Sequence, residues 1–272
     1  MIESIDFTKS EQYTLSIRLS TDGFSFSIYD PFFEGKLYLK QYPVNTQRSM
    51  AANVKTFLAE TEELKHVYKQ INILIHSPRY TSVPLEVFED EQMEMLFYQN
   101  LSKQNNEIIL CNILGKSNLV ILFSIDKLTH QFLTDTFPQA RFFASVSPQI
   151  ELLTDRSKLG NNCKLYANLH SHSIDVCCFD RGKLQLLNTY PVSTPEDRCY
   201  YLLNVWKIVG YDQERDELHL TGNLLQRDIL MPELKKYIRR IFIINPQAEL
   251  HLVTDTPAEE IPFDIQALQI CE

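Results

Sequence analysis

The sequence predicts an α/β protein of two related lobes, each with the element order βββαβα, and two observations carry this prediction. The stretches Leu15–Val44 and Leu165–Val192 each read as an alternating strand, a polar turn, a second strand that ends in Asp, another turn, and a third strand that ends in Tyr-Pro-Val. After both stretches the apolar spacing changes from the period of a strand to that of a helix. A duplicated meander followed by a helix therefore predicts one lobe for each copy.

The first lobe is expected to span residues 1–156. Its first strand, from Tyr13 to Ser20, alternates in such a way that Ser16 and Arg18 are predicted to lie on a solvated face. The meander of this lobe therefore has the pattern of a sheet that packs on a core with one side only.

A helix and a buried strand are predicted to follow the first meander. Apolar residues fall on one helical stripe from Met50 to Tyr68, and Asn45 or Thr46 is available as the N-cap. The continuous apolar run Ile71–Ile75 is typical of a strand that is buried on both faces. Because it returns through a helical crossover, this strand is expected to lie parallel to a neighbour.

The segment of about 85–135 has no counterpart in the second half and is predicted to be a small αββα insertion in the first lobe. Pro78 and Pro84 bracket a predicted loop before it. The elements expected in the insertion are a helix (Asp90–Ser102), two strands (Glu107–Leu114 and Leu119–Ser124) and a helix capped by Asp126.

The second lobe is expected to span residues 157–272. After its meander, Thr194-Pro195-Glu196-Asp197 has the N-cap, proline and acidic first turn of a helix start, and Gly210 stops that helix. The elements expected next are a crossover strand (Glu217–Thr221), a stretch that is mostly helix and that Pro232 restarts (Leu224–Arg240), two strands (Ile241–Ile244 and Glu249–Val253) and a short tail.

The charge and the cysteines limit the class of protein. A net charge of −9 argues against nucleic acid as a general partner, because phosphate contacts require a basic face. The acidic start is unlike a signal peptide, and no run approaches the roughly 20 apolar residues of a membrane span. The six scattered cysteines are expected to be free thiols. We therefore expect a soluble, cytoplasmic protein.

Glycine is scarce, and its distribution excludes several nucleotide-binding motifs. The chain has only 7 glycines, and they do not cluster. Neither a P-loop nor a dinucleotide-binding fingerprint is therefore present.

Three polar turns lie next to predicted strands. They read Ser20-Thr21-Asp22-Gly23, Asn168-Leu169-His170-Ser171-His172-Ser173-Ile174-Asp175, and Leu220-Thr221-Gly222-Asn223. With the duplicated βββαβα order and the insertion, these turns resemble the superfamily of actin, heat-shock chaperone ATPases and sugar kinases. The layout is most similar to its bacterial cell-division and pilus-assembly branches, and to an uncharacterised Bacteroidetes family thought to have this ribonuclease H-like, actin-like fold.

The resemblance implies that nucleotide, if it binds, does so through these three turns. In the first turn the family has Asp-x-Gly-[Thr/Ser], but Ser20 occupies the Asp position and Asp22 the Gly position. The Asp-Gly pair is therefore out of register and is also consistent with a plain hairpin turn. In the second turn the family has Asp-x-Gly-Gly-Gly-Thr-Thr-Asp, and His170, Ser171 and His172 replace all three glycines. Side chains stand where backbone amides would meet phosphates, so ordinary phosphate cradling is not expected.

The third turn is the best preserved. The family has two adjacent glycines after the crossover strand, and Gly222 keeps the first, while Asn223 tolerates the left-handed conformation of the second. The same two residues are also what a strand-to-helix turn needs for folding alone. If ATP with magnesium binds, the expected contacts are Ser20, Thr21, Asp22, Gly23, Asn168, His170, Ser171, His172, Ser173, Thr221, Gly222 and Asn223.

Other chemistry is less well supported. His170 and His172 lie two residues apart with Cys163, Asp175 and Cys177 nearby, but no second pair has a recognised ligand spacing, so no metal site is predicted. Cys177 and Cys178 are predicted to be buried and inert. His76 and His219 lie near the ends of predicted parallel strands, and both the structural and the ligand-binding interpretation remain open. No catalytic residue is assigned.

Three hypotheses about function follow. The preferred one is a degenerate actin-like pseudoenzyme, a scaffold or regulatory protein that has lost ordinary ATP hydrolysis and acts through an unidentified protein partner. The alternative is a nucleotide-binding slow ATPase or small-molecule kinase of the same superfamily with altered phosphate loops. The third is a protein that binds a ligand unlike ATP in the cleft that the two-lobed fold is expected to have. No motif identifies the partner or the oligomeric state.

Overall fold

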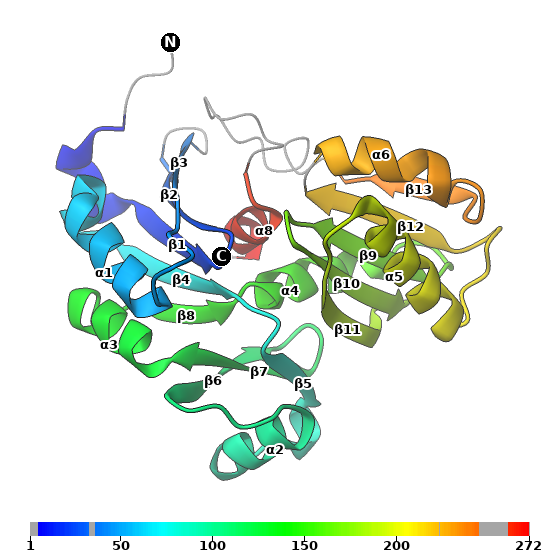
Figure 1. Cartoon of the computed structure of the whole chain (residues 1–272), viewed down its shortest axis with the longest axis horizontal. Coiled ribbons are helices and arrows are strands. Elements are labelled where there is room, and N and C mark those ends of the chain that lie inside the picture. The colour runs from blue at the N-terminus through cyan, green and yellow to red at the C-terminus, as the bar shows by residue number, and fades with distance from the viewer. Residues whose placement is uncertain (1–4, 33–35, 223, 245–260, 272) are drawn as a thin grey trace. The chain divides into compact units, whose positions relative to one another are not determined.

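The computed structural model describes residues 5–32, 36–222, 224–244 and 261–271 (Figure 1). The chain divides into two compact units. Among the described residues, the first unit contains 5–113 and 118–147 without the gap at 33–35, and the second contains 114–117, 148–244 without residue 223, and 261–271. No helix in these ranges has the length and apolar character required to cross a membrane.

The first unit is built on a five-stranded sheet of order β3-β2-β1-β4-β8. Its strands are β1 (Thr14–Ser20), β2 (Gly23–Asp30), β3 (Lys36–Tyr42), β4 (Gln70–His76) and β8 (Arg141–Ala144). β2 pairs antiparallel with β1 and β3, whereas β4 lies parallel to both β1 and β8. The predicted meander and parallel crossover strand are therefore confirmed.

The central position of β1 buries it on both faces, which corrects the prediction of a solvated face. Ser16 and Arg18 are only 0% and 8% exposed, like the apolar residues between them. Alternation of polar and apolar residues shows that the two faces of a strand differ in polarity, but it does not show what covers each face. Here the polar face of the strand is also covered.

The first helix is shorter than its apolar stripe predicts. It is α1 (Met50–Glu60), and its N-cap is Ser49, whose side chain accepts a hydrogen bond from Ala52 N. Asn45, predicted as a possible N-cap, instead accepts from Gln47 N in a turn before the helix. Two 3₁₀ turns also belong to this unit. η1 (Phe7–Gln12) precedes β1, and η2 (Glu62–Lys65) follows α1. Because the helix ends at Glu60, Val67 leaves the predicted buried stripe and is 67% exposed.

The insertion contains one strand more than predicted. β5 (Tyr80–Pro84) occupies most of the predicted loop and pairs antiparallel with β7 (Leu119–Asp126), which gives a three-stranded sheet of order β5-β7-β6. The proline at the end of β5 is compatible with pairing because β5 is an edge strand. The other elements are η3 (Leu85–Val87), η4 (Asp90–Gln92), α2 (Met93–Asn100), β6 (Glu107–Leu114) and α3 (Lys127–Thr136). As predicted, Asp126 caps α3 and accepts from Thr129 N.

A buried amide joins the insertion to the edge of the first sheet. Asn112 of β6 donates to Phe142 O at 2.8 Å and accepts from Ala144 N at 2.9 Å, and both partners are main-chain groups of β8. The hydroxyl of Ser147 also donates to the Asn112 oxygen at 2.7 Å. One side chain therefore satisfies main-chain groups on the outer side of the edge strand β8.

The second unit repeats the arrangement of the first sheet in the order β11-β10-β9-β12-β13. Its strands are β9 (Lys164–Leu169), β10 (Ser173–Asp180), β11 (Lys183–Pro191), β12 (Glu217–Gly222) and β13 (Arg240–Ile243). β9 and β11 pair antiparallel with β10, and β12 lies parallel to β9 and β13. Figure 1 shows that α5 (Pro195–Ile208) and α6 (Leu224–Leu234) lie beside this sheet. The predicted duplication is confirmed strand by strand.

The helices of the second unit follow local signals. Thr194 and Asp197 form the predicted capping box of α5, and Leu202, Val205 and Trp206 bury one face of it. α4 (Val146–Ser157) precedes the second meander. Two predictions need correction, because α6 ends at Leu234 with Pro232 inside it, and the predicted tail contains α8 (Phe263–Cys271). The predicted strand Glu249–Val253 lies outside the described residues.

Candidate functional site

In the first unit, polar residues lie at the ends of the parallel strands. Ser20 at the end of β1 is paired in register with His76 at the end of β4. The Nδ1 atom of His76 lies 3.0 Å from the hydroxyl of Ser145, which directly follows β8. The carboxyl ends of adjacent parallel strands thus bring three polar side chains to one edge, where open α/β sheets bind ligands.

The first predicted turn is a tight hairpin in the structure. Ser20 pairs with Gly23, so Thr21 and Asp22 form the two-residue loop. The Ser20 hydroxyl is buried and accepts from Asp22 N at 3.1 Å, whereas the side chains of Thr21 and Asp22 are exposed. The serine at the family's Asp position therefore stabilises its own turn.

In the second unit, strand pairing brings the other two predicted turns together. β9 and β12 are parallel neighbours in which Thr221 pairs with Asn168, and Gly222 pairs with Leu169. The hairpin from His170 to Ser173 therefore begins beside the end of β12. Asn223 lies outside the described residues. Of the predicted set, Asn168, His170, Ser171, His172, Ser173, Thr221 and Gly222 lie at this edge of the second sheet.

Asp175 is the buried centre of this edge. Its side chain is 1% exposed and accepts from the Thr189 hydroxyl at 2.8 Å and from the Gln149 amide at 3.3 Å. The Nε2 atom of His170 lies 2.8 Å from Oδ2, the same carboxylate oxygen that the Gln149 amide contacts, whereas Thr189 contacts Oδ1. A carboxylate only accepts hydrogen bonds, so the Nε2–H group of His170 is the donor in this contact. Both oxygens are therefore engaged, as a buried charge requires.

Asn168 extends the network. Its amide donates to the Gln149 oxygen at 3.2 Å, so that Gln149 connects Asn168 with Asp175. The side-chain oxygen of Asn168 is buried and has no hydrogen-bond partner among the described residues. This oxygen is the one acceptor in the network for which the described residues supply no donor.

A buried arginine holds the hairpin from the side of α5. The Nη2 atom of Arg198 donates to His170 O at 2.9 Å and to Ser171 O at 2.8 Å. The Arg198 side chain is 2% exposed, and burial lowers the pKa of its guanidinium from the usual value. On the other side of the hairpin, Val192 N donates to His172 O at 2.9 Å. Three consecutive carbonyls of the turn are thus bound within the unit.

Gly222 has a structural reason to be glycine. Its φ is +88°, and a Cβ at this position would lie 2.2 Å from Leu169 O and 2.8 Å from the Asn168 side-chain oxygen. Any larger residue would collide with the backbone of β9. This close approach explains the glycine without a nucleotide.

The residues of this edge do not fit the phosphate cradle of an ATP-binding actin-like protein. Such a cradle needs glycines whose backbone N–H groups point at the phosphates. Here His170 N donates to Ser173 O at 2.9 Å, and the carbonyls of the turn are fixed by Arg198 and Val192. The imidazole of His170 is turned to Asp175, and Ser171 and His172 carry exposed side chains.

The other candidate residues are located as follows. His219 is stacked between Tyr166 and Phe242, at ring-centroid distances of 4.8 and 5.0 Å, and its Nε2 lies 3.0 Å from Glu217. Burial lowers the pKa of His219 despite that carboxylate. Cys177 and Cys178 are buried as predicted, and burial raises the pKa of the Cys178 thiol to about 12. Thiols of this kind are not nucleophiles at neutral pH.

Three residues of the network were missed at the level of sequence. Arg198 had a usable signal, because it lies four residues before Leu202 on the apolar stripe of α5, where a charge must find partners. Thr189 is the cross-strand partner of Asp175, which the register of a hairpin could have revealed. Gln149 comes from α4, outside the meander, and nothing in its neighbourhood identifies it.

Comparison with known proteins agrees with the fold. A protein from Bacteroides thetaiotaomicron VPI-5482, described as having an actin-like ATPase fold and unknown function, is 49% identical, with a TM-score of 0.88 over 99% of this chain and 100% of that chain. The PilM-PilN type IV pilus biogenesis complex contains a chain with a TM-score of 0.63 at 12% identity, over 95% of this chain and 98% of that chain. The search of curated proteins found no match. The predicted resemblance to actin-like proteins is confirmed.

The sequence also matches a family profile over residues 2–241, which is most of the chain. The description of that family is "Protein of unknown function (DUF3822)". With the duplicated sheets and the 49% identical structure, the match establishes that this chain has the actin-like fold and belongs to the DUF3822 family.

Proposed function

We propose that this protein is a non-catalytic actin-like scaffold or regulatory protein, which acts through protein–protein contacts and has lost ordinary ATP hydrolysis. The main support is the hairpin at the carboxyl edge of the second sheet. Arg198 binds its carbonyls, and His170, Thr189 and Gln149 occupy the carboxylate of Asp175. A loop fixed in this way stabilises the unit but lacks the flexible glycines that a phosphate needs.

One similar solved structure supports a role in assembly. The similar chain at a TM-score of 0.63 belongs to a complex described as PilM-PilN, so in that case a protein with this fold is part of a protein complex. At 12% identity this likeness extends to the fold only. We also infer a cytoplasmic location, because the described cysteines are free thiols, as is usual in a reducing compartment.

The alternative is a nucleotide-binding slow ATPase or small-molecule kinase with altered loops. One observation favours it, namely that Asp175 places a buried carboxylate at the carboxyl edge of the sheet, where ligands of open α/β sheets bind. In this alternative, Ser20–Gly23, Asn168, the turn 170–173 and Thr221–Asn223 would contact nucleotide.

Thermal unfolding with Mg-ATP distinguishes these proposals. A ligand at 100 times its Kd adds about 2.7 kcal/mol to the stability of the folded state, which corresponds to a rise of several degrees in Tm. We expect no rise with millimolar Mg-ATP relative to magnesium alone, and no phosphate release above that of a protein-free control. A rise that Asp175→Asn abolishes would establish the alternative.

Partner capture then tests the scaffold role. The full chain, immobilised in Mg-ATP-free buffer, should retain a defined protein from extract of its own organism, and the purified pair should form a complex by size-exclusion chromatography. If the purified chain binds neither nucleotide nor protein, the scaffold proposal fails and binding of a ligand unlike ATP becomes the better hypothesis.

A further inference from the structure

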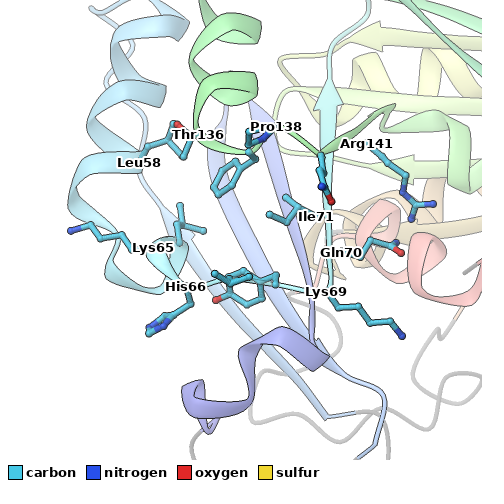
Figure 2. A pocket seen from close by; sticks show the side chains of 14 residues that line it. Leu58, Lys65, His66, Lys69, Gln70, Ile71, Thr136, Pro138 and Arg141 are labelled. Atoms are coloured by element: carbon cyan, nitrogen blue, oxygen red, sulfur yellow. The ribbon is translucent and has the colours of Figure 1, made fainter.

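A pocket lies in the first unit, at the edge of the sheet opposite to the ends of β1 and β4 that carry Ser20 and His76. Its volume is about 650 Å³, which lies within the usual range for small-molecule sites. It is lined by the end of α1, by η2 and the start of β4, and by the chain from the end of α3 into β8 (Figure 2). It therefore lies at the amino ends of the parallel strands, away from the turns discussed above.

The floor of the pocket is apolar. Leu64, Tyr68 and Phe137 are 3%, 7% and 5% exposed, and they are anchored in the core of the unit. Figure 2 shows Leu58 and Ile71, both half-buried, on opposite sides of the space. Such a floor offers contact area to the apolar body of a ligand.

The rim of the pocket is basic. The described side chains that line it include Lys65, His66, Lys69 and Arg141, and none of the described lining residues is Asp or Glu. Glu62 lies just outside and pairs with Lys65 at 2.5 Å. The ends of α1 and α3 add about half a negative charge each. Three full positive charges on the rim therefore exceed the nearby negative charge, in a chain whose net charge is −9.

Two rim residues have defined positions. The ring of His66 stacks on Phe7, with centroids 4.8 Å apart. The guanidinium of Arg141 donates to the side-chain oxygen of Asn72 at 3.1 Å. Lys69 also lines the pocket, its side chain is exposed, and its backbone N–H donates to Tyr13 O. Because Lys65 is paired with Glu62 and Arg141 donates to Asn72, Lys69 is the lining cation that we assign to an incoming negative charge.

We propose that this pocket binds a small amphipathic anion, with an apolar body on the floor formed by Leu64, Tyr68 and Phe137 and a carboxylate or phosphate head at Lys69. An apolar molecule without charge would leave the basic rim unused, and an inorganic anion would leave the apolar floor exposed to water. The pocket is independent of the ATP question, because none of its lining residues belongs to the three turns.

Binding of octanoate, octyl phosphate and 1-octanol, measured by isothermal titration calorimetry with the full chain, tests the proposal. The three probes share an apolar body and differ in the head group. We expect at least one of the two anions to bind, with an affinity about tenfold or more above that of octanol at low ionic strength. A preference between the two anions identifies the head group as carboxylate or phosphate. Equal binding of octanol, or no binding of either anion, overturns the proposal.

Variants locate the binding. Lys69→Glu should weaken binding of the anion by about tenfold and leave octanol binding unchanged. Lys55→Glu is the matched control, because Lys55 is an exposed lysine of α1 that does not line the pocket, and it should have no effect beyond long-range screening. Leu58→Trp should fill the space and abolish binding, with an unchanged circular dichroism spectrum as evidence of folding. Unchanged affinity in Lys69→Glu would show that the anion binds elsewhere.

Discussion

The hairpins β1–β2 and β9–β10 are two copies of one pattern, and they pair in the same register. Residues 15–30 and 165–180 align without a gap, so Arg18 opposite Ser25 corresponds to Asn168 opposite Asp175. The turns differ. The first is closed by its own serine hydroxyl, whereas the second is held by Arg198, Gln149 and Thr189, which come from three other elements.

This difference shows that sheet pairing and polar chemistry are specified separately. The register follows from alternation along the strands, which both copies retain. The network around Asp175 depends on side chains from distant parts of the sequence, which can change while the strands stay paired. An actin-like unit can therefore keep its sheet and exchange the chemistry at its edge.

Gly222→Ala should have the largest effect and tests how the two copies differ next to the hairpin. In the first copy Ile75 lies beside Leu19, whereas in the second Gly222 lies beside Leu169. The new Cβ would lie 2.2 Å from Leu169 O at a φ of +88°, so we expect a loss of about 3 kcal/mol or more, measured by urea unfolding. Gly160→Ala is the control, with φ +78° and open space around it, and should cost about 1 kcal/mol. Equal losses would refute the steric explanation.

Arg198→Met tests the hydrogen bonds from Arg198 to the turn, which the first hairpin lacks. The change keeps the apolar stem but leaves His170 O and Ser171 O without their donor, so we expect a loss of roughly 2–3 kcal/mol in the free energy of unfolding. Hydrogen exchange should also speed up in the turn 170–173. Lys207→Met, at an exposed position of the same helix, should change stability by no more than about 0.5 kcal/mol. Similar losses for both variants would mean that the hydrogen bonds of Arg198 contribute nothing to the free energy of unfolding.

Asp175→Ser gives the second copy the residue that the first copy has at the corresponding position, Ser25. His170, Thr189 and Gln149 would lose their shared acceptor, so we expect a loss of about 2 kcal/mol in chemical denaturation. Ser25→Ala at the corresponding position of the first copy should cost less than about 1 kcal/mol. A fully stable Asp175→Ser protein would show that the two copies do not differ in the way proposed.

The two copies also differ, to a smaller extent, in how their stability depends on pH. His219 beside Tyr166 corresponds in the first copy to Asn72 beside Ser16, which does not titrate. Burial lowers the pKa of His219, so below about pH 6.5 the unfolded chain binds a proton that the folded state does not. This contribution to stability is complete above the unfolded pKa and is lost as the pH falls towards the folded pKa.

Melting temperatures at pH 7 and 5.5 measure this contribution. The wild-type protein should lose more stability between the two pH values than His219→Phe, which keeps a ring between Tyr166 and Phe242. Glu217 titrates at lower pH, because hydrogen bonds from Asn162 and His219 outweigh burial and lower its pKa. The same pH dependence in both proteins would assign the effect to other groups, such as His130, whose pKa burial also lowers.

Much of the fold could be predicted from the sequence because its signals are local. The copied strands, the parallel Ile71–Ile75 run and the Thr194 capping box all depend on residues that are close in sequence. The errors arose where tertiary context decides. β5 is stabilised by pairing with β7, and both faces of β1 are covered because it is the central strand.

The site was predictable only in part, for a related reason. Placing Asn168 and Thr221 together required only the order of the strands, which the duplication supplies. The partners of Asp175 and of the turn at His170 required knowledge of which side chains of α4, β11 and α5 reach them. Arg198 has a sequence signal because it is a charge on an apolar stripe, and Thr189 has one because it lies opposite Asp175 in the hairpin, whereas Gln149 has none.

Asn112 has a consequence for the behaviour of this chain in concentrated solution. By occupying Phe142 O and Ala144 N, its amide takes away two of the main-chain groups that a strand from another molecule would need in order to extend the sheet. The insertion thus prevents strands of other molecules from adding at this edge. A variant without the insertion would expose an unpaired edge strand, and copies of it would be prone to assemble into fibres.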